Sequence, residues 1–464
     1  MKWQQLLSQK RRGSLASGRE RKDLRTEFEK DYHRIIGSAS FRRLQDKTQV
    51  FPLDKSDFIR TRLTHSLEVS SIGRSLAENI SASIMEKRLD PTFTLETKEA
   101  VCEILQCAGL IHDIGNPPFG HFGEEAIREW FVHHLPELMV NGRRAVDLLD
   151  EQELADLLHF EGNAQGLRLV SKLHFFNNEH GMDLTYGLLS CMIKYPVSSV
   201  EIDDSAADIR FKKMGYFKAE QDLFDTIQTE TGTCGARNPL TFILEAADDI
   251  AYATADIEDA FKKGFFDIYT FRKEMDERGV PVEIIATLDE LYEEALCRKL
   301  TNPQEYVLMN SLTIWQNRLL ETATDSFITH YKAIMDGTFV SDLLSGSRDG
   351  VLLEALKGIA YDYAFTSASI YRTEIAANTI LTYLLDHLVP AAVAFNGRTS
   401  PGLMEEKFIS LVSDNYKATY NHESVGLDEN RKLYLKLLLV TDSISGMTDS
   451  HARDLFHELT GNKI

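Results

Sequence analysis

Apolar residues recur at every third or fourth position along most of the chain, which is the spacing of amphipathic helices. The clearest example is a predicted helix whose apolar face carries Val69, Ile72, Leu76, Ile80 and Ile84. Strict alternation of apolar and polar residues, typical of a half-buried strand, is rare along the chain. The pattern therefore predicts an all-α fold with at most a small β-hairpin, for which Val197–Ile202 is the best candidate strand.

Breaks between the predicted helices fall where turn-forming residues gather, at 13–18, 115–122, 229–239, 344–347 and 396–402. The last helix is expected from Asp449 to Thr460, ended by Gly461. None of these breaks is long or polar enough to separate independent domains. We therefore expect residues 1–464 to form a single unit, with a core at approximately 60–260 and a C-terminal helical region at approximately 265–464.

Composition agrees with a large globular protein, since 43% of the 464 residues are hydrophobic and 9% are aromatic. The five cysteines show no C-x-x-C pairing, which favours a reduced, cytoplasmic setting. The stretch 379–395 is interrupted by Asp386, His387 and Pro390, so no segment is expected to span a membrane. The N-terminus lacks the apolar region of a signal peptide.

Charge is distributed unevenly. The whole chain carries −20, yet residues 1–62 hold sixteen Lys and Arg against eight Asp and Glu. A basic segment folded against an acidic body would suit a polyphosphate ligand, because a triphosphate carries roughly four negative charges. The alternative is a solvated basic arm. This alternative is less favoured because four basic residues lie beside the motifs described below, namely Arg42, Arg43, Lys47 and Arg62.

Two adjacent metal-binding side chains, His112 and Asp113, end an apolar helical stretch. His65 lies at the N-terminal end of the apolar face described above, and Asp248 lies on a further predicted helix. Together they form a mixed imidazole and carboxylate ligand set, which suits Mn²⁺, Fe²⁺ or Mg²⁺ better than a closed, cysteine-rich zinc site. Asp249 points about 100° further around its helix and is the weaker candidate.

Two further patterns indicate a pocket beside this metal group. Asp248, Tyr252 and Asp256 recur every four residues, so they share one helix face, which suits a pocket wall better than a core. His121 follows a Pro-Pro turn and a glycine, which favours a positioned side chain, with Glu124 three residues later. The alternative is that His121 and Glu124 only begin the next helix.

The sequences around these residues resemble the HD superfamily of metal-dependent phosphohydrolases, and within it the dGTPase-like deoxynucleoside triphosphate triphosphohydrolases. The matching stretches keep the family's order along almost the whole chain, at 41–50, 62–65, 112–124, 160–165, 194–196, around Asp248 and at 445–449. Residues 265–425 carry few matches. The resemblance implies a helical HD core that hydrolyses a deoxynucleoside triphosphate (dGTP or several dNTPs) to deoxynucleoside and inorganic triphosphate.

The reaction itself suggests why His121 is needed. Water attacking the α-phosphorus can expel either pyrophosphate or the 5′-oxygen of the nucleoside, and only the 5′-alkoxide needs protonation as it leaves. The resembled family releases the whole triphosphate, and His121 occupies the position of its catalytic His. The resemblance therefore implies that His121 is a general acid and that Glu124 orients it and holds its proton.

The resemblance also implies the substrate contacts. Gln49, Tyr252 and Asp256 are expected at the deoxyribose 3′-hydroxyl, with Tyr252 packed where a ribose 2′-hydroxyl would not fit. Two cations, Arg62 and Lys194, are the expected ligands of the triphosphate. Asn163, which lies in the matching stretch 160–165, is also expected to face the site.

One departure from the family concerns Phe160, where vertebrate relatives have a His. The nearest histidine is His159, one position earlier, so a second catalytic His is in doubt.

The implied cofactor is a divalent metal, Mn²⁺ or Mg²⁺, with Fe²⁺ as a further candidate. The implied partners are a dNTP and other copies of the chain in a tetramer or hexamer, with an activating nucleotide as an open alternative. Nucleic acid is not favoured and no membrane is expected.

Two other functions stay open, namely another HD phosphohydrolase (a nucleotidase or phosphodiesterase) and a nuclease that uses the basic N-terminal segment. The preferred base does not follow from the sequence.

Overall fold

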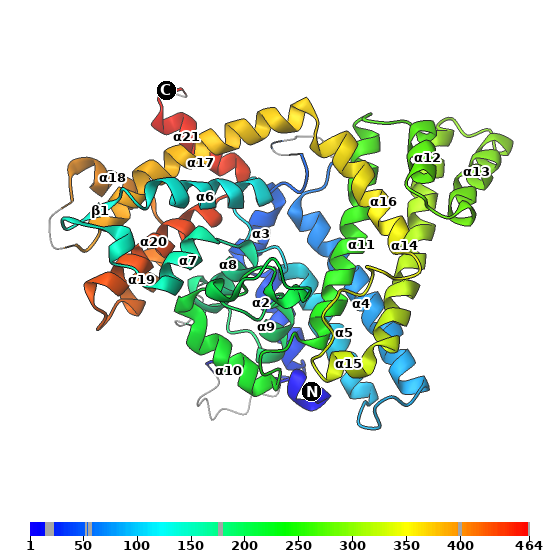
Figure 1. Cartoon of the computed structure of the whole chain (residues 1–464), viewed down its shortest axis with the longest axis horizontal. Helices are drawn as coiled ribbons and strands as arrows, with labels where there is room; N and C mark the ends of the chain where they lie inside the picture. The colour runs from blue at the N-terminus through cyan, green and yellow to red at the C-terminus, as the bar shows by residue number, and fades with distance from the viewer. Residues whose placement is uncertain (14–22, 52, 54–57, 175–179, 398–400, 463–464) are drawn as a thin grey trace.

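The computed structural model describes residues 1–13, 23–51, 53, 58–174, 180–397 and 401–462. Within these residues the chain is built from helices and one two-stranded sheet (Figure 1). The prediction of an all-α fold is therefore confirmed. Among the same residues, none of the helices is both long and apolar enough to cross a membrane.

Short 3₁₀ or π turns, labelled η, interrupt the α-helices. In the first part of the chain the helices are α1 (Trp3–Leu6), α2 (Glu27–Ile36), α3 (Ala39–Arg43), η1 (Leu44–Asp46), α4 (Arg62–Glu86), α5 (Leu95–Ile111), α6 (Gly120–His134), η2 (Ala145–Asp147), α7 (Glu151–Leu158), α8 (Gly162–Arg168), η3 (Leu169–Leu173), α9 (Tyr186–Met192), η4 (Ser199–Glu201), η5 (Ile209–Phe211), η6 (Lys218–Glu220) and α10 (Gln221–Thr231).

The second part of the chain begins with a long buried helix. Its helices are α11 (Pro239–Lys262), α12 (Ile268–Glu277), α13 (Val282–Cys297), α14 (Pro303–Thr329), α15 (Tyr331–Met335), α16 (Gly350–Ala360), η7 (Tyr361–Phe365), α17 (Ala368–Ala394), α18 (Leu403–Leu411), α19 (Asp414–Glu423), α20 (Glu429–Ser445) and α21 (Asp449–Leu459).

Three of these helices, α4, α5 and α11, pack against one another and form the centre of the molecule. The apolar face predicted for α4 is buried there, with Val69, Leu76, Ile80 and Ile84 at most 1% exposed. Helices α4 and α5 approach closely because Gly109 has no side chain, since a Cβ at that position would lie 2.5 Å from Ser70 Cα. This close packing brings the N-terminal turn of α4 beside the C-terminal end of α5.

The C-terminal helices return to the N-terminal part of the chain. Helix α17 runs along α6 and also contacts α18, α20 and α21, while α16 packs on α11 (Figure 1). The last helix begins at Asp449 and ends at Leu459, one residue before the predicted end. The proposed division into a core and a C-terminal region stays a prediction.

The predicted strand at Val197–Ile202 is wrong. Residues 199–201 form the turn η4, because Glu201 accepts hydrogen bonds from the Ser198 amide (2.8 Å) and hydroxyl (2.7 Å) and so caps the turn. The sheet instead consists of β1 (Met139–Val140) and β2 (Arg143–Arg144). Their two-residue link, Asn141-Gly142, has positive φ at both positions, which is the commonest turn chemistry of a hairpin.

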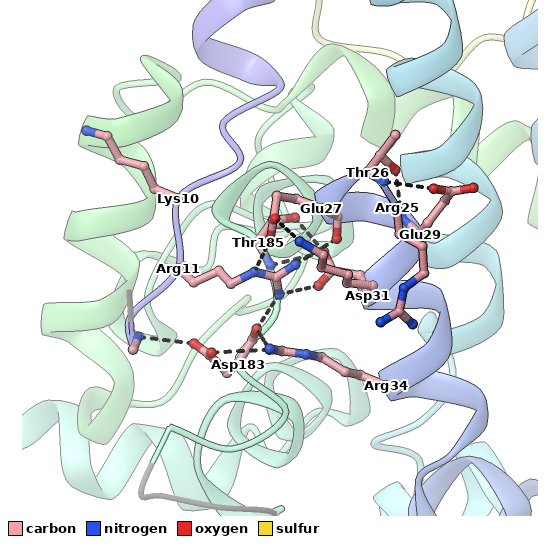
Figure 2. A network of polar contacts seen from close by, with 12 residues as sticks. Lys10, Arg11, Arg25, Thr26, Glu27, Glu29, Asp31, Arg34, Asp183 and Thr185 are labelled. Carbon is pink, nitrogen blue, oxygen red and sulfur yellow. Dashed lines mark hydrogen bonds and ion pairs between the residues drawn. The ribbon is translucent and has the colours of Figure 1, made fainter. Parts of the chain in front are cut away.

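A buried arginine holds the N-terminal arm of the chain on the body of the molecule (Figure 2). The Arg11 cluster consists of Arg11, Glu27, Asp31, Asp183 and Thr185. The guanidinium of Arg11 donates to the carboxylates of Glu27 and Asp31 and to the carbonyl oxygens of Glu27 and Asp183. Asp31 also accepts the amide (3.1 Å) and the hydroxyl (2.7 Å) of Thr185. This cluster shows that part of the basic N-terminal segment is used for folding.

Candidate metal and nucleotide site

The four predicted metal ligands come together from three helices. His65 lies in the first turn of α4, His112 and Asp113 follow the last residue of α5, and Asp248 lies on α11. Asp248 Oδ1 is 3.1 Å from His65 Nε2 and 3.4 Å from His112 Nε2. The ligand atoms of His65, His112 and Asp113 all lie within 4.8 Å of one another. These distances would allow one ion to be held between them.

The chemistry of this group fits a divalent cation. The ring of His112 is fixed by its Nδ1, which lies 2.8 Å from the Gly109 carbonyl oxygen, while its buried Nε2 forms no hydrogen bond among the described residues. Burial opposes protonation of His112, yet the carboxylates of Asp113 and Asp248 outweigh it and raise its pKa to about 9. Positive charge is therefore favoured at this point, as a metal ligand set requires.

Arg62 lies against this group. Its guanidinium forms an ion pair with Asp113, whose other oxygen accepts a hydrogen bond of 2.8 Å from the Asn116 side chain. Gly120 has a φ of +63°, and a Cβ there would lie 2.4 Å from Arg62 Nη2. Both the positive φ and the closeness of Arg62 favour glycine at this position, which accounts for the glycine that precedes His121.

A pocket of about 880 Å³ opens beside the group. Most of the predicted site residues line it, namely Gln49, Arg62, His112, Asp113, His121, Glu124, Asn163, Lys194, Asp248 and Tyr252. His65 and Asp256 do not line it, because both are buried behind its wall, at 0% and 2% exposure. Nearly all of the site residues predicted from the sequence therefore line one cavity.

His121 and Glu124 form a close pair at the start of α6. His121 Nδ1 is 2.9 Å from one Glu124 oxygen, and the other oxygen accepts the Gly162 amide at 2.8 Å. The hydrogen bond to Glu124 raises the pKa of His121, and burial only partly opposes it. Burial of Glu124 would raise its own pKa, but His121 and Lys213 outweigh this and lower it. The geometry suits a protonated imidazole held by an ionised carboxylate.

Lys194 belongs to a buried row of charges. Its ammonium is 3.5 Å from Glu245, whose second oxygen is 2.7 Å from the guanidinium of Arg237. Burial would raise the pKa of Glu245, but Arg237 and Lys194 outweigh it and lower that pKa to about 2. Lys194 therefore faces the pocket as a cation held by an ionised carboxylate.

Tyr252 and Asp256 lie one behind the other on α11. Burial raises the pKa of both groups, and that of Asp256 lies well above its usual range. A neutral Asp256 beside Tyr252 places little negative charge at this end of the pocket. The ring of Tyr252 lies parallel to that of Phe365, with centroids 6.3 Å apart.

Sequence reasoning missed one wall of the pocket. This wall is built by α16, η7 and the first turns of α17, with Glu354, Lys357, Gly358, Tyr361, Phe365, Ile370, Thr373, Glu374 and Ala377. The spacing of Ile370, Glu374 and Ala377 indicates one helix face, but such spacing is also typical of ordinary core packing. Lys357 reaches across to Asp249, with 2.9 Å between ammonium and carboxylate.

Lys213 is a further cation that the sequence did not single out, and it lines the pocket 2.9 Å from Glu161.

Of the four basic residues that lie beside the motifs, Arg62 lines the pocket, whereas Arg42, Arg43 and Lys47 do not. Of these four residues, therefore, Arg62 is the one that the described pocket brings to its surface. Lys47 is buried and donates to two carbonyl oxygens, and Arg43 donates to the Gly446 carbonyl oxygen at 3.0 Å.

Comparison with known proteins places the chain in a family. The HD domain family matches residues 62–182. A deoxyguanosinetriphosphate triphosphohydrolase-like protein of Listeria monocytogenes is 43% identical over 99% of this chain and 100% of its own length. A protein of the same name from Synechocystis is 34% identical over 99% of both chains, and a deoxyguanosinetriphosphate triphosphohydrolase of Enterobacter is 32% identical over 93% of both. The chain therefore belongs to the deoxyguanosinetriphosphate triphosphohydrolase-like family of HD-domain proteins.

Proposed function

We propose that this protein is a metal-dependent triphosphohydrolase that converts a deoxynucleoside triphosphate, dGTP or several dNTPs, to deoxynucleoside and inorganic triphosphate. One observation carries the proposal. A single cavity brings together three of the four predicted metal ligands, a His–Glu pair suited to general acid catalysis, and one arginine and three lysines from four separate segments of the chain. The names of the relatives agree with it.

The cations of the pocket would hold the triphosphate. Arg62, Lys194, Lys213 and Lys357 line the cavity from four separate segments of the chain, so they could meet several phosphoryl oxygens at once. Each is paired with a carboxylate in this structure, which keeps the ammonium or guanidinium groups in place before the substrate binds. An anionic ligand would compete for these cations.

His65, His112, Asp113 and Asp248 would hold a divalent cation, which would supply a water of lowered pKa and positive charge for the phosphoryl chemistry. His121 then protonates the departing 5′-oxygen, since an alkoxide is a poor leaving group without a proton. Glu124 keeps that proton on His121 and fixes the ring. Mn²⁺ and Mg²⁺ suit the oxygen-containing ligand set, and Fe²⁺ is a further candidate.

The sugar would lie against α11. Tyr252 and Gln49 line the pocket, and the Gln49 side-chain oxygen is buried without a hydrogen-bond partner among the described residues. This oxygen can accept a hydrogen bond from the 3′-hydroxyl, with Asp256 supporting Tyr252 from behind. The ring of Tyr252 would exclude the 2′-hydroxyl of a ribonucleotide.

The test is a product assay with each of the four dNTPs and with GTP, with and without a chelator. We expect inorganic triphosphate and deoxynucleoside from at least dGTP, no product after chelation, and little turnover of GTP. Pyrophosphate and a monophosphate as products would instead favour another HD phosphohydrolase. Release of nucleotides from DNA, with no turnover of free dNTPs, would favour a nuclease.

We also propose a cytoplasmic homo-oligomer, a tetramer or hexamer, as the family implies. Tyr371 and Ile375 on the first half of α17 support it, because both are large side chains with 49% and 69% of their surface exposed. Light scattering at micromolar concentration tests this assembly, and a monomer would contradict it.

A further inference from the structure

The loop that carries His121 into the pocket has an unusual backbone. Phe119 has φ +64° and ψ +14°, and Gly120 follows with φ +63°. Left-handed backbone is common for glycine but is a rare conformation for a bulky residue such as Phe119. Phe119 is 5% exposed and immediately precedes α6, so its conformation sets the direction in which the helix and His121 begin.

Helix α6 also lacks the usual support at its start. Its N-cap residue is Phe119, whose side chain cannot accept a hydrogen bond from the first turn. By contrast, α2, α4 and α7 each begin with a capping box on Thr26, Thr61 and Asp150. The start of α6 therefore depends on contacts from elsewhere in the chain.

Asp449 makes one of these contacts. It is 2% exposed and stands at the end of the segment 445–449, a family motif to which sequence analysis gave no role. One of its oxygens accepts the Phe119 amide at 2.8 Å, while the other accepts the amide (3.0 Å) and the hydroxyl of Thr48. Asp449 thus ties the His121 loop to the segment that precedes α4.

Lys47 makes a second tie between the same three segments. Its buried ammonium donates to the Ser445 carbonyl oxygen at 2.6 Å and to the Asn116 carbonyl oxygen at 2.5 Å. The ammonium therefore joins the end of α20 to the loop three residues before Phe119. Two buried polar side chains from opposite ends of the chain hold one loop by its backbone.

We propose that Asp449 and Lys47 are positioning residues, which hold the left-handed turn at Phe119 and Gly120 and thereby aim His121 at the departing oxygen. The segment 445–449 then serves catalysis without lining the pocket. The proposal rests on the proposed function, in which His121 is the general acid.

The main test is Asp449→Asn, which keeps the size of the side chain but can no longer accept all three hydrogen bonds. We expect kcat for dGTP to fall by about 10- to 100-fold, since small displacements of a catalytic group are costly. KM should change less than kcat, because Lys194, Lys213 and Lys357 line the pocket from segments that Asp449 does not contact. Metal content should not change.

A double-mutant cycle separates positioning from general damage. If Asp449 acts through His121, Asp449→Asn should cause no further loss of kcat in the His121→Ala background. Losses that multiply in the double variant would overturn the proposal. Lys47→Met should show the same pattern with a smaller loss. The Lys47→Met variant also serves as a second test if Asp449→Asn does not fold. A folded Lys47→Met variant with parental kcat would contradict the proposal.

The chain offers a matched control in Asp31→Asn. Asp31 is fully buried and accepts the amide and hydroxyl of Thr185, much as Asp449 accepts those of Thr48, but it lies in the Arg11 cluster and not at the pocket. Asp31→Asn should lower the melting temperature and leave kcat unchanged. A fall in kcat equal to that of Asp449→Asn would show that the effect is not specific to the loop.

Hydrogen exchange gives a readout that does not depend on activity. Amide exchange of the peptide 115–122 should be faster in Asp449→Asn than in the parent protein and in Asp31→Asn. Unchanged exchange there would overturn the anchoring role. If the parent releases no triphosphate but exchange responds as expected, the proposed function fails while the anchoring of the loop stands.

Discussion

The Arg11 cluster and the metal group both bury charged side chains from distant segments, but they differ in how their polar atoms are used. In the Arg11 cluster the guanidinium meets four oxygens, and both oxygens of Asp31 accept hydrogen bonds. In the metal group, by contrast, His112 Nε2 and His65 Nδ1 are buried without hydrogen-bond partners among the described residues.

The difference indicates that one region contributes to folding and the other to binding. Buried polar groups are normally paired, because an unpaired one costs about 1–3 kcal/mol. The fully paired Arg11 cluster is typical of a region that contributes to folding. The metal group, by contrast, leaves His112 Nε2 without a hydrogen bond at the wall of a cavity, which is typical of a binding site that is not optimised for stability alone. The predictions below test this contrast.

The largest effect is expected for His112→Ala, which removes one ligand of the metal group. Bound metal and turnover of dGTP should both be lost, because the remaining groups no longer form the ligand set. Elemental analysis and a product assay measure these quantities. In addition, Mn²⁺ should raise the melting temperature of the parent but not that of the variant. Full metal occupancy in the variant would sink the assignment.

The next effect is expected for His121→Ala, which lies at the same pocket but outside the metal group. Metal should be retained and dGTP should still bind, while kcat falls by roughly two to four powers of ten, the usual contribution of a general acid. Steady-state kinetics with metal analysis checks this. Parental turnover would reduce His121 to a residue that only begins a helix.

A structural effect is expected for Arg11→Ala in the paired cluster. Removing one partner of a buried ion pair leaves Asp31 uncompensated, which typically costs about 3–5 kcal/mol of folding free energy. Urea denaturation should show this loss, whereas kcat per folded molecule and metal content should match the parent. A loss of kcat without a loss of stability would contradict the division between the two regions.

The smallest effect is expected for Glu124→Gln. The hydrogen bond to Glu124 raises the pKa of His121, so His121 stays protonated to higher pH and activity is lost as pH rises through that pKa. Without the carboxylate this pKa falls, and the alkaline limb of the kcat–pH profile should move to lower pH. Glu125, which lies 3.5 Å from His121 Nε2, gives a matched control.

Glu125→Gln should move the same limb in the same direction but less. Lys213 acts in the opposite direction, since its charge lowers the pKa of His121. An unchanged limb in Glu124→Gln would mean that His121 is not the group that titrates in the reaction.

Much of the site was predictable because its residues stand in short local motifs. Helix periodicity places His65 and Asp248 on the inward faces of their helices, and Asp248 meets both His65 and His112 as expected. The His121–Glu124 pair follows from a spacing of three residues on one helix. Such spacings are properties of single helices and can be read without knowing how the helices pack.

The remaining parts depend on tertiary packing, which local patterns do not encode. Phe365 and Glu374 line the pocket only because α16 packs on α11 and α17 runs along α6. The mixture of apolar and polar residues at Val197–Ile202 favoured a strand, but the cap on Ser198 decided the local structure. Asp449 has no sequence pattern that points to Phe119, which lies 330 residues earlier.

That separation of 330 residues also has a consequence for how the protein is made. At cellular rates of synthesis, the ribosome needs roughly 15 to 65 s to proceed from Phe119 to Asp449. The four proposed metal ligands, by contrast, have all been synthesised once Asp248 has been translated. All of the proposed ligands are therefore present in the growing chain well before Asp449, so under the proposed role of Asp449 the loop of His121 is anchored only near the end of synthesis.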